Sequence, residues 1–272
     1  MKLAEKLRSC LQDRRGFTLL ELSVTLSVFF IILFSVYMVH ETNQASYSQS
    51  EMRMDIQQNA RVALATMERE LRMAGYGVPK QLAGVSMIAD ARPKTITFRA
   101  DLRNVISTLT SAAASGNSDL SVSTTAGIAN GDAIYLTNGS KAEALTVPAG
   151  WVPSPTSLST STRTNAYASG SRVFVPRDVR FTIAGGQLLR EERIPNGAWP
   201  GSATVLADRI VEQDAFRYYN AANAEIASNN PVASPDANIR RIRITLNASG
   251  TPSGLNVQSY TLISDVKPRN LE

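Results

Sequence analysis

A single apolar stretch near the N-terminus constrains this chain more than any other feature. Phe17–Val39 contains 23 residues and one formal charge, that of Glu21. As a helix rising about 1.5 Å per residue, the stretch would span roughly 35 Å, which is enough to cross a bilayer. Arg14 and Arg15 precede it, and positive charge on that side orients the N-terminus toward the cytoplasm. The sequence therefore predicts a single-pass membrane protein.

The order of charged, small and apolar residues differs from that of an ordinary secretory signal. There the small residues of the cleavage site follow the apolar run, whereas here Gly16 precedes it. Cleavage after Gly16 would remove a charged leader, residues 1–16, and keep the apolar helix on a mature chain that begins at Phe17. The leader holds five cations and two anions, so the formal charge falls from +5 to about +2. A nearly neutral mature chain argues against nucleic acid as a partner.

Glu21 is the charge that the apolar stretch must accommodate. A carboxylate in a membrane helix costs about 2–4 kcal/mol, so we expect it to have a partner. It lies four residues from Phe17, or about 6 Å along a helix axis, and Phe17 would carry the new N-terminal amine.

The residues Arg14-Arg15-Gly16-Phe17-Thr18-Leu19-Leu20-Glu21-Leu22 resemble the type IV prepilin signal. The resemblance implies that a prepilin peptidase/methyltransferase cuts between Gly16 and Phe17 and methylates the Phe17 amine. It also implies that Glu21 meets the Phe17 amine of a neighbouring subunit, which would set the register between apolar helices. The alternative is a signal anchor that is not cleaved and in which Glu21 has no specific function.

The helix is expected to continue beyond the membrane. Neither Gly nor Pro occurs between Gly16 and Gly75, which allows one helix of up to 58 residues, roughly 85 Å long. The first half, residues 17–39, is transmembrane, and residues 40–74 form an amphipathic half. The predicted apolar stripe consists of Met52, Ile56, Ala60, Ala63, Met67, Leu71 and Ala74. We expect this stripe to pack against a sheet, and Gly75, Gly77 and Pro79 to end the helix.

Residues 75–272 read as a β domain. Hairpins are predicted at Asn138-Gly139 and at Gly185-Gly186, where turn residues separate β-prone runs. The expected strands are Thr95–Ala100, Ala133–Thr137, Ala142–Val147, Arg180–Ala184, Gln187–Arg190, a strand ending at Tyr219, Ile239–Leu246 and Leu255–Ile263. Residues 107–118, 153–165 and 220–237 are expected to be polar loops.

A second resemblance lies after the membrane segment. Ala60–Gly77, with its Arg-Met-Ala-Gly-Tyr sequence, is similar to minor pilins of the PilW type, as are the later runs Leu188-Leu189-Arg190 and Ile239–Leu246. This resemblance implies a pilin-like α+β fold, in which the long N-terminal α-helix packs on an antiparallel β-sheet and a small β module is inserted at about 110–180. The J-type secretion pseudopilins share the same outline.

The resemblance implies a structural function. The chain would be a minor pilin that helps to initiate, prime or cap a type IV pilus fibre, with roles in twitching motility and cell adhesion. Its partners would be major and minor pilins, the peptidase/methyltransferase, the inner-membrane assembly platform and, before assembly, membrane lipid. It would sit in the inner membrane with the β domain in the periplasm, and then in the fibre at the cell surface. The alternatives are a minor type II secretion pseudopilin and a pilus-borne adhesin or DNA-binding subunit.

No enzyme motif accompanies these features. The mature chain would have a single histidine and no cysteine, because Cys10 lies in the leader, and we predict no catalytic, cofactor-binding or metal-binding residues. Arg241 and Arg243 are the candidates for nucleic-acid contact. Alternation along Ile239–Leu246 places them on one strand face, and a solvated amphipathic strand is the preferred interpretation.

Overall fold

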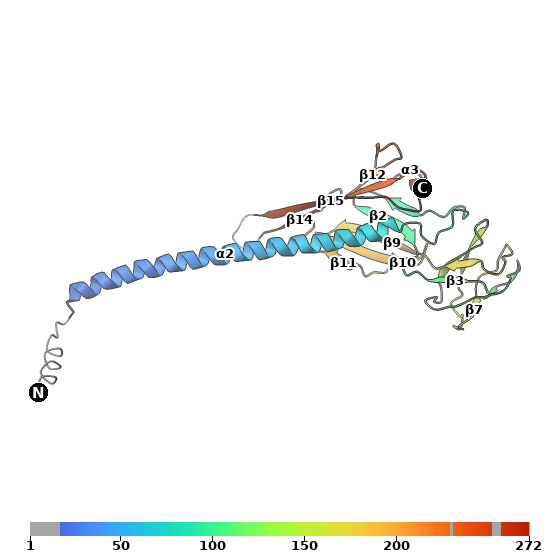
Figure 1. Cartoon of the computed structure of the whole chain (residues 1–272), viewed down its shortest axis with the longest axis horizontal. Coiled ribbons are helices and arrows are strands. Elements are labelled where there is room, and N and C mark those ends of the chain that lie inside the picture. Colours follow the sequence, from blue (N-terminus) through green and yellow to red (C-terminus); the bar gives the residue numbers. More distant parts are fainter. Residues whose placement is uncertain (1–16, 229–230, 252–256, 272) are drawn as a thin grey trace, which may run out of the picture. The chain divides into compact units, whose positions relative to one another are not determined.

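The computed structural model describes residues 17–228, 231–251 and 257–271, and we refer to these as the described residues. The leader and Gly16 lie outside them. The chain divides into two units: helix residues up to Met52 belong to the first, and the residues from Arg53 onward form the second. Figure 1 labels the elements, and each unit is treated by itself below.

One helix, α2, runs from Leu19 to Arg72 and accounts for 54 residues. Within the second unit, its residues from Arg53 onward bury one face, as the apolar stripe predicts. The buried helix side chains are Ile56, Ala60, Ala63, Leu64, Met67 and Leu71. Met67 and Leu71 are wholly inaccessible, at 0% exposure. The amphipathic half of the helix thus supplies part of the domain core.

The helix ends a little before the expected glycines. Two tighter bonds close its last turn, from Met73 N to the Glu70 carbonyl at 3.0 Å and from Ala74 N to the Leu71 carbonyl at 3.1 Å. Gly75 follows with a φ of 81°, and its N–H donates to the Arg99 carbonyl at 2.8 Å. A Cβ at Gly75 would approach the Met87 sulfur to 2.7 Å, so glycine is needed where the chain leaves the helix.

The largest sheet has five antiparallel strands in the order β1-β2-β9-β10-β11. Their bounds are β1 Ile88–Ala91, β2 Thr95–Ala100, β9 Arg177–Ala184, β10 Gln187–Arg193 and β11 Thr204–Ala207. The β9–β10 hairpin turns at Gly185 and Gly186, both with positive φ, as a type I′ turn requires. Phe98 and Phe181 are fully buried on neighbouring strands and stack at 5.9 Å.

A second sheet has the order β13-β12-β14-β15. Its strands are β12 Phe216–Tyr219, β13 Glu225–Ile226, β14 Arg241–Gly250 and β15 Gln258–Val266, and the short helix α3 spans Pro235–Asn238. The long β14–β15 pair is the antiparallel pair expected from the sequence. An isolated bridge between Ile210 and Ala248 joins the end of the five-stranded sheet to β14.

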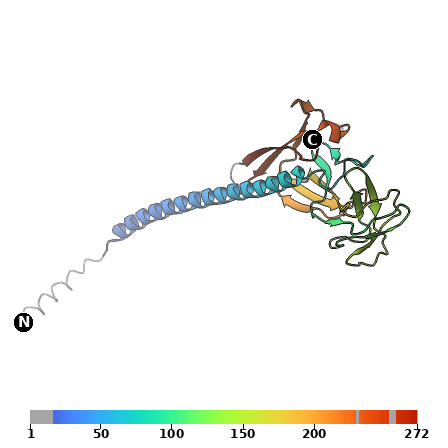
Figure 2. The ribbon, with the colours of Figure 1, turned by 45° about the vertical axis from the view of Figure 1, so that its right-hand side comes forward.

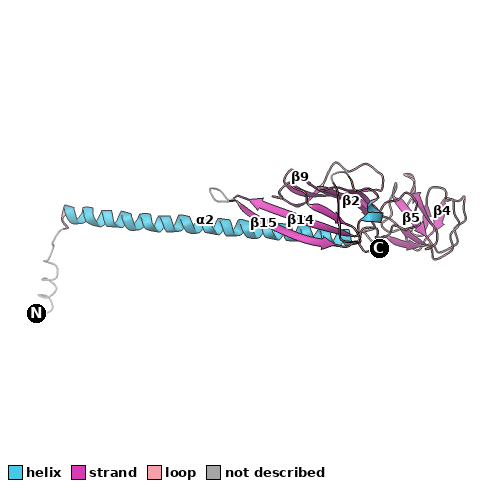
Figure 3. Ribbon diagram, turned by 90° about the horizontal axis from the view of Figure 1, so that it is seen from above, coloured by secondary structure: helices cyan, strands magenta, loops and turns pink. Residues whose placement is uncertain are grey.

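Polar contacts attach the second half of α2 to these sheets. Glu70 accepts a hydrogen bond from Arg190 of β10 at 2.9 Å, and Arg61 donates to the Tyr260 hydroxyl of β15 at 3.1 Å. The backbone N–H of Arg269 reaches the Arg72 carbonyl at 3.2 Å. Figure 3 shows β14 and β15 alongside this part of the helix. The result confirms the predicted α+β architecture, a long N-terminal helix with antiparallel sheets.

Residues between β2 and β9 form a separate β module (Figure 2). Its strands are β3 Ile106–Thr108, β4 Asp119–Ser121, β5 Ala133–Thr137, β6 Ala142–Thr146, β7 Ser157–Ser159 and β8 Arg172–Phe174. They form a four-stranded sheet, β3-β8-β5-β6, and a two-stranded sheet, β4-β7. A cluster of buried residues that includes Leu120, Ile134 and Trp151 gives the module its own core. Strand β9, Arg177–Ala184, follows the module and pairs with β2 and β10.

One ion pair and one buried hydrogen bond connect the module to the five-stranded sheet. Arg99 of β2 binds Asp178 of β9 at 2.7 Å and also donates to the Tyr135 hydroxyl of the module at 2.9 Å. Arg177 binds Asp132 of the module at 2.6 Å. Asp178 is fully buried, and its second oxygen accepts from Arg193 at 3.2 Å. These charges satisfy one another at the junction and hold the module in place.

Candidate assembly segment

The first part of α2 is apolar and exposed along its whole length. Its most apolar window of 18 residues has a mean hydropathy of 2.4, and none of it is buried. Phe17 and Leu19 at its start are 80% and 86% exposed. A helix of this length and composition can cross a membrane. So much exposed apolar surface needs lipid or other helices to cover it.

The helix start is capped by its own sequence. The hydroxyl oxygen of Thr18 accepts a hydrogen bond from Glu21 N at 3.2 Å, and its carbonyl accepts from Leu22 N at 3.1 Å. Thr18 is therefore the N-cap residue, and Glu21 occupies the third helical position. Thr-x-x-Glu is the capping-box pattern, which could have identified Thr18 from the sequence. The Glu21 carboxylate also lies where the helix dipole favours negative charge.

Hydroxyl side chains in this segment bond back to the helix itself. Thr25 donates to the Glu21 carbonyl at 2.9 Å, Ser27 to the Ser23 carbonyl at 2.8 Å, and Ser35 to the Ile31 carbonyl at 2.8 Å. These donors therefore need no water, which suits a helix surrounded by lipid or by other apolar helices.

Glu21 stands apart from these satisfied groups. Its carboxylate has no hydrogen bond or ion pair to another side chain within the described residues. An unpaired carboxylate on an apolar helix can be compensated by a cation that another molecule supplies. The predicted cleavage site between Gly16 and Phe17 lies at the same end of the helix as Glu21. Gly16 itself lies outside the described residues.

The comparison with protein families gives this segment a class. The model of the prokaryotic N-terminal methylation motif matches residues 11–37, which include the capped helix start and Glu21. The comparison with curated proteins found no match. The motif and the exposed apolar helix support a type IV pilin-like or pseudopilin subunit, a class of membrane-anchored structural proteins that assemble with other pilins.

The other predicted site residues lie far along the chain, on β14. Arg241 and Arg243 both bind Asp265 of β15, at 3.1 and 2.9 Å. The Arg241 guanidinium also stacks 3.9 Å from the centre of the Tyr219 ring. The two arginines therefore share one carboxylate, which neutralises one of their two positive charges. Among the described residues, no group of three or more His, Cys, Asp and Glu side chains is placed to hold a metal ion.

Proposed function

We propose that this chain is a minor pilin of a type IV pilus, which helps to initiate, prime or cap the fibre through its N-terminal helix. The observation that carries the proposal is the exposed apolar segment, residues 17–39, with its capped start and its match to the methylation motif. The large domain with an inserted module, together with the PilW-like sequence of Ala60–Gly77, favours a specialised subunit over the repeating one.

Processing and location follow from the same proposal. A prepilin peptidase/methyltransferase would cut between Gly16 and Phe17 and methylate Phe17. Before assembly the helix would anchor the chain in the inner membrane with the β domain in the periplasm. The assembly platform would then move it into the fibre beside other pilins.

Glu21 would act in assembly as one end of an intersubunit ion pair. The support is its unpaired carboxylate in residues 17–39, a segment with no other formally charged side chain. The amine of Phe17 in the next subunit is the complementary charge, since cleavage would create it at the same end of the helix. Pairing the two would relieve the cost of each and fix the register of helix packing.

The test is Glu21→Ala in the native strain. We expect normal membrane insertion and leader cleavage, with strong loss of the subunit from sheared surface fibres. Glu51→Ala is the matched control, because Glu51 is another exposed carboxylate on the same helix and has no partner among the described residues. Normal incorporation of the Glu21 variant would remove this role for the carboxylate.

A minor pseudopilin of a type II secretion system is the second candidate, supported by the same motif and by the J-type outline. A deletion strain scored for surface pili, twitching and protein secretion separates the two. Loss of pili and twitching with normal secretion supports the pilus. Loss of secretion with normal pili supports the pseudopilus.

A further inference from the structure

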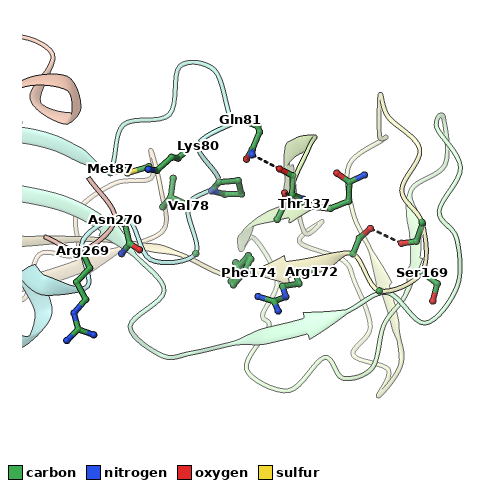
Figure 4. A pocket seen from close by; sticks show the side chains of 18 residues that line it. Val78, Lys80, Gln81, Met87, Thr137, Ser169, Arg172, Phe174, Arg269 and Asn270 are labelled. Atoms are coloured by element: carbon green, nitrogen blue, oxygen red, sulfur yellow. Dashed lines mark hydrogen bonds between the residues drawn. The ribbon is translucent and has the colours of Figure 1, made fainter. Parts of the chain in front are cut away.

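A cavity of about 780 Å³ opens between the pilin-like sheets and the inserted module. Its walls come from segments that are distant in the sequence: residues 75–81 after α2, residues 137–139 and 168–172 of the module, and residues 269–270. Figure 4 shows Val78, Lys80 and Asn270 on one side, facing Thr137, Phe174 and Arg172 on the other. The volume lies within the usual range for sites that bind small molecules.

Hydrogen bonds fix the two sides of this cavity relative to each other. Gln81 donates to the Gly139 carbonyl at 2.6 Å across the gap (Figure 4). The Arg99–Tyr135 and Arg177–Asp132 hydrogen bonds also link the module to the five-stranded sheet. The cavity is therefore largely preformed, which lowers the entropic cost of binding.

The charged side chains that line the cavity are all positive. Its 18 residues include three cations, Lys80, Arg172 and Arg269, and no carboxylate side chain. Within the described residues, the guanidinium groups of Arg172 and Arg269 make no hydrogen bond or ion pair. Most other arginines of the domain have such partners, as Arg99, Arg190 and Arg243 do. Each free guanidinium has five N–H donors available for an anionic ligand.

The remaining lining suits a ligand rich in hydroxyl groups. Six side chains are neutral hydrogen-bonding groups: Gln81, Thr137, Asn138, Ser169, Ser171 and Asn270. Four glycines leave backbone groups accessible, and the Phe174 ring supplies an apolar surface. All six side chains already make hydrogen bonds within the domain, as Ser171 does to the Ala168 carbonyl at 2.7 Å. Their remaining lone pairs and amide N–H groups can bond sugar hydroxyls, while an aromatic ring can cover the C–H face of a sugar.

We propose that this cavity binds an acidic sugar, with the Arg172 guanidinium contacting its carboxylate. The site would make the inserted module a ligand-binding part of the subunit, an activity that does not depend on the assembly function of the N-terminal helix. Failure of one proposal therefore leaves the other unaffected.

Titration calorimetry on the full mature chain in detergent tests the proposal with three probes: trigalacturonic acid, the neutral galactose trimer and triglutamate. We expect trigalacturonic acid to bind and each of the other two to bind at least about tenfold more weakly. Arg172→Gln should weaken binding of the acidic sugar by about tenfold, since a charge-assisted hydrogen bond is lost. Arg53→Gln, which alters an exposed arginine of α2 outside the cavity, should change nothing.

Arg172 is exposed, so its substitution should leave the fold intact, which a thermal unfolding curve would verify. Arg172→Ala provides a second variant, which should weaken binding at least as much. Absence of binding by trigalacturonic acid, equal binding of the neutral trimer, or wild-type affinity in both Arg172 variants would overturn the proposal. Tighter binding of triglutamate would replace the sugar with an acidic peptide and overturn it equally.

Discussion

The two halves of α2 share one continuous helix but differ in where their apolar side chains go. From Arg53 onward, side chains such as Met67 and Leu71 are completely buried in the domain. Before Met52, the large apolar side chains are exposed, and Phe30 is 59% accessible. The second half therefore contributes to folding, and the first half has an apolar surface that only lipid or another subunit can cover. Mutations in the two halves should separate these roles.

The largest loss of stability is expected from the buried charges of the domain. Asp178→Ala would leave Arg99 without its bidentate partner in an environment where Arg99 is only 4% exposed. Breaking a buried pair in this way costs about 3–5 kcal/mol. Chemical denaturation of the domain would measure the loss. Asp208→Ala is the control, because Asp208 is an exposed carboxylate. Equal stability of the two variants would contradict a stabilising role for the buried Asp178–Arg99 pair.

Substitution in the buried half of the helix should cost slightly less. Leu71→Ala removes a fully buried side chain and leaves a cavity, which lowers the free energy of unfolding by about 2–5 kcal/mol. Val62→Ala on the same helix should change it by less than about 0.5 kcal/mol, because Val62 is 60% exposed. Similar losses in both variants would mean that the helix does not pack through this face.

A smaller, pH-dependent effect is expected on the second sheet. The hydrogen bond from Arg243 lowers the pKa of the Asp265 carboxyl below its ordinary value. A lowered pKa in the folded state stabilises the fold above the unfolded pKa, and this contribution is lost as the pH falls through the lowered value. The free energy of unfolding of the Asp265→Asn variant should therefore fall less than that of the wild type between neutral and strongly acidic pH. Unfolding midpoints of the wild type and the variant, measured across that pH range, would show this difference. Identical pH profiles of the two proteins would contradict the expected contribution of Asp265.

The exposed half should show no stability effect at all. Phe30→Ala should leave domain unfolding unchanged, because its side chain contributes nothing to the domain core. The variant should instead reduce recovery of the subunit in fibres, since apolar contacts between helices would be lost. A fall in domain stability equal to that of Leu71→Ala would erase the distinction between the two halves.

Local patterns predicted much of this fold. The absence of Gly and Pro up to Gly75 indicates the long helix, and the Gly185-Gly186 turn indicates the β9–β10 hairpin, because both signals lie within a short stretch of chain. Short strands, some with distant partners, were missed. Strands β7 and β13 lie within the segments 153–165 and 220–237, which were predicted to be polar loops.

Candidate sites divide in the same way. The Gly16–Phe17 junction and Glu21 could be proposed from the sequence because the residues of the motif are contiguous, and both stay predictions. The cavity could not be predicted, since its walls come from four segments that are distant in the sequence. Its positive charge becomes apparent only when the fold brings Lys80, Arg172 and Arg269 to one space. For Arg241 and Arg243, the sequence shows that they share a strand face, but only the fold shows that both contact Asp265.

The central claim is that this chain is processed as a prepilin and assembles through the helix that begins at its new N-terminus. Mass spectrometry of the N-terminal peptide, from cells with and without the prepilin peptidase, tests it most directly. The account predicts a mature chain that starts at N-methylated Phe17 in normal cells and an intact leader in cells without the peptidase. An uncleaved leader in normal cells, or cleavage after the apolar segment, would contradict it.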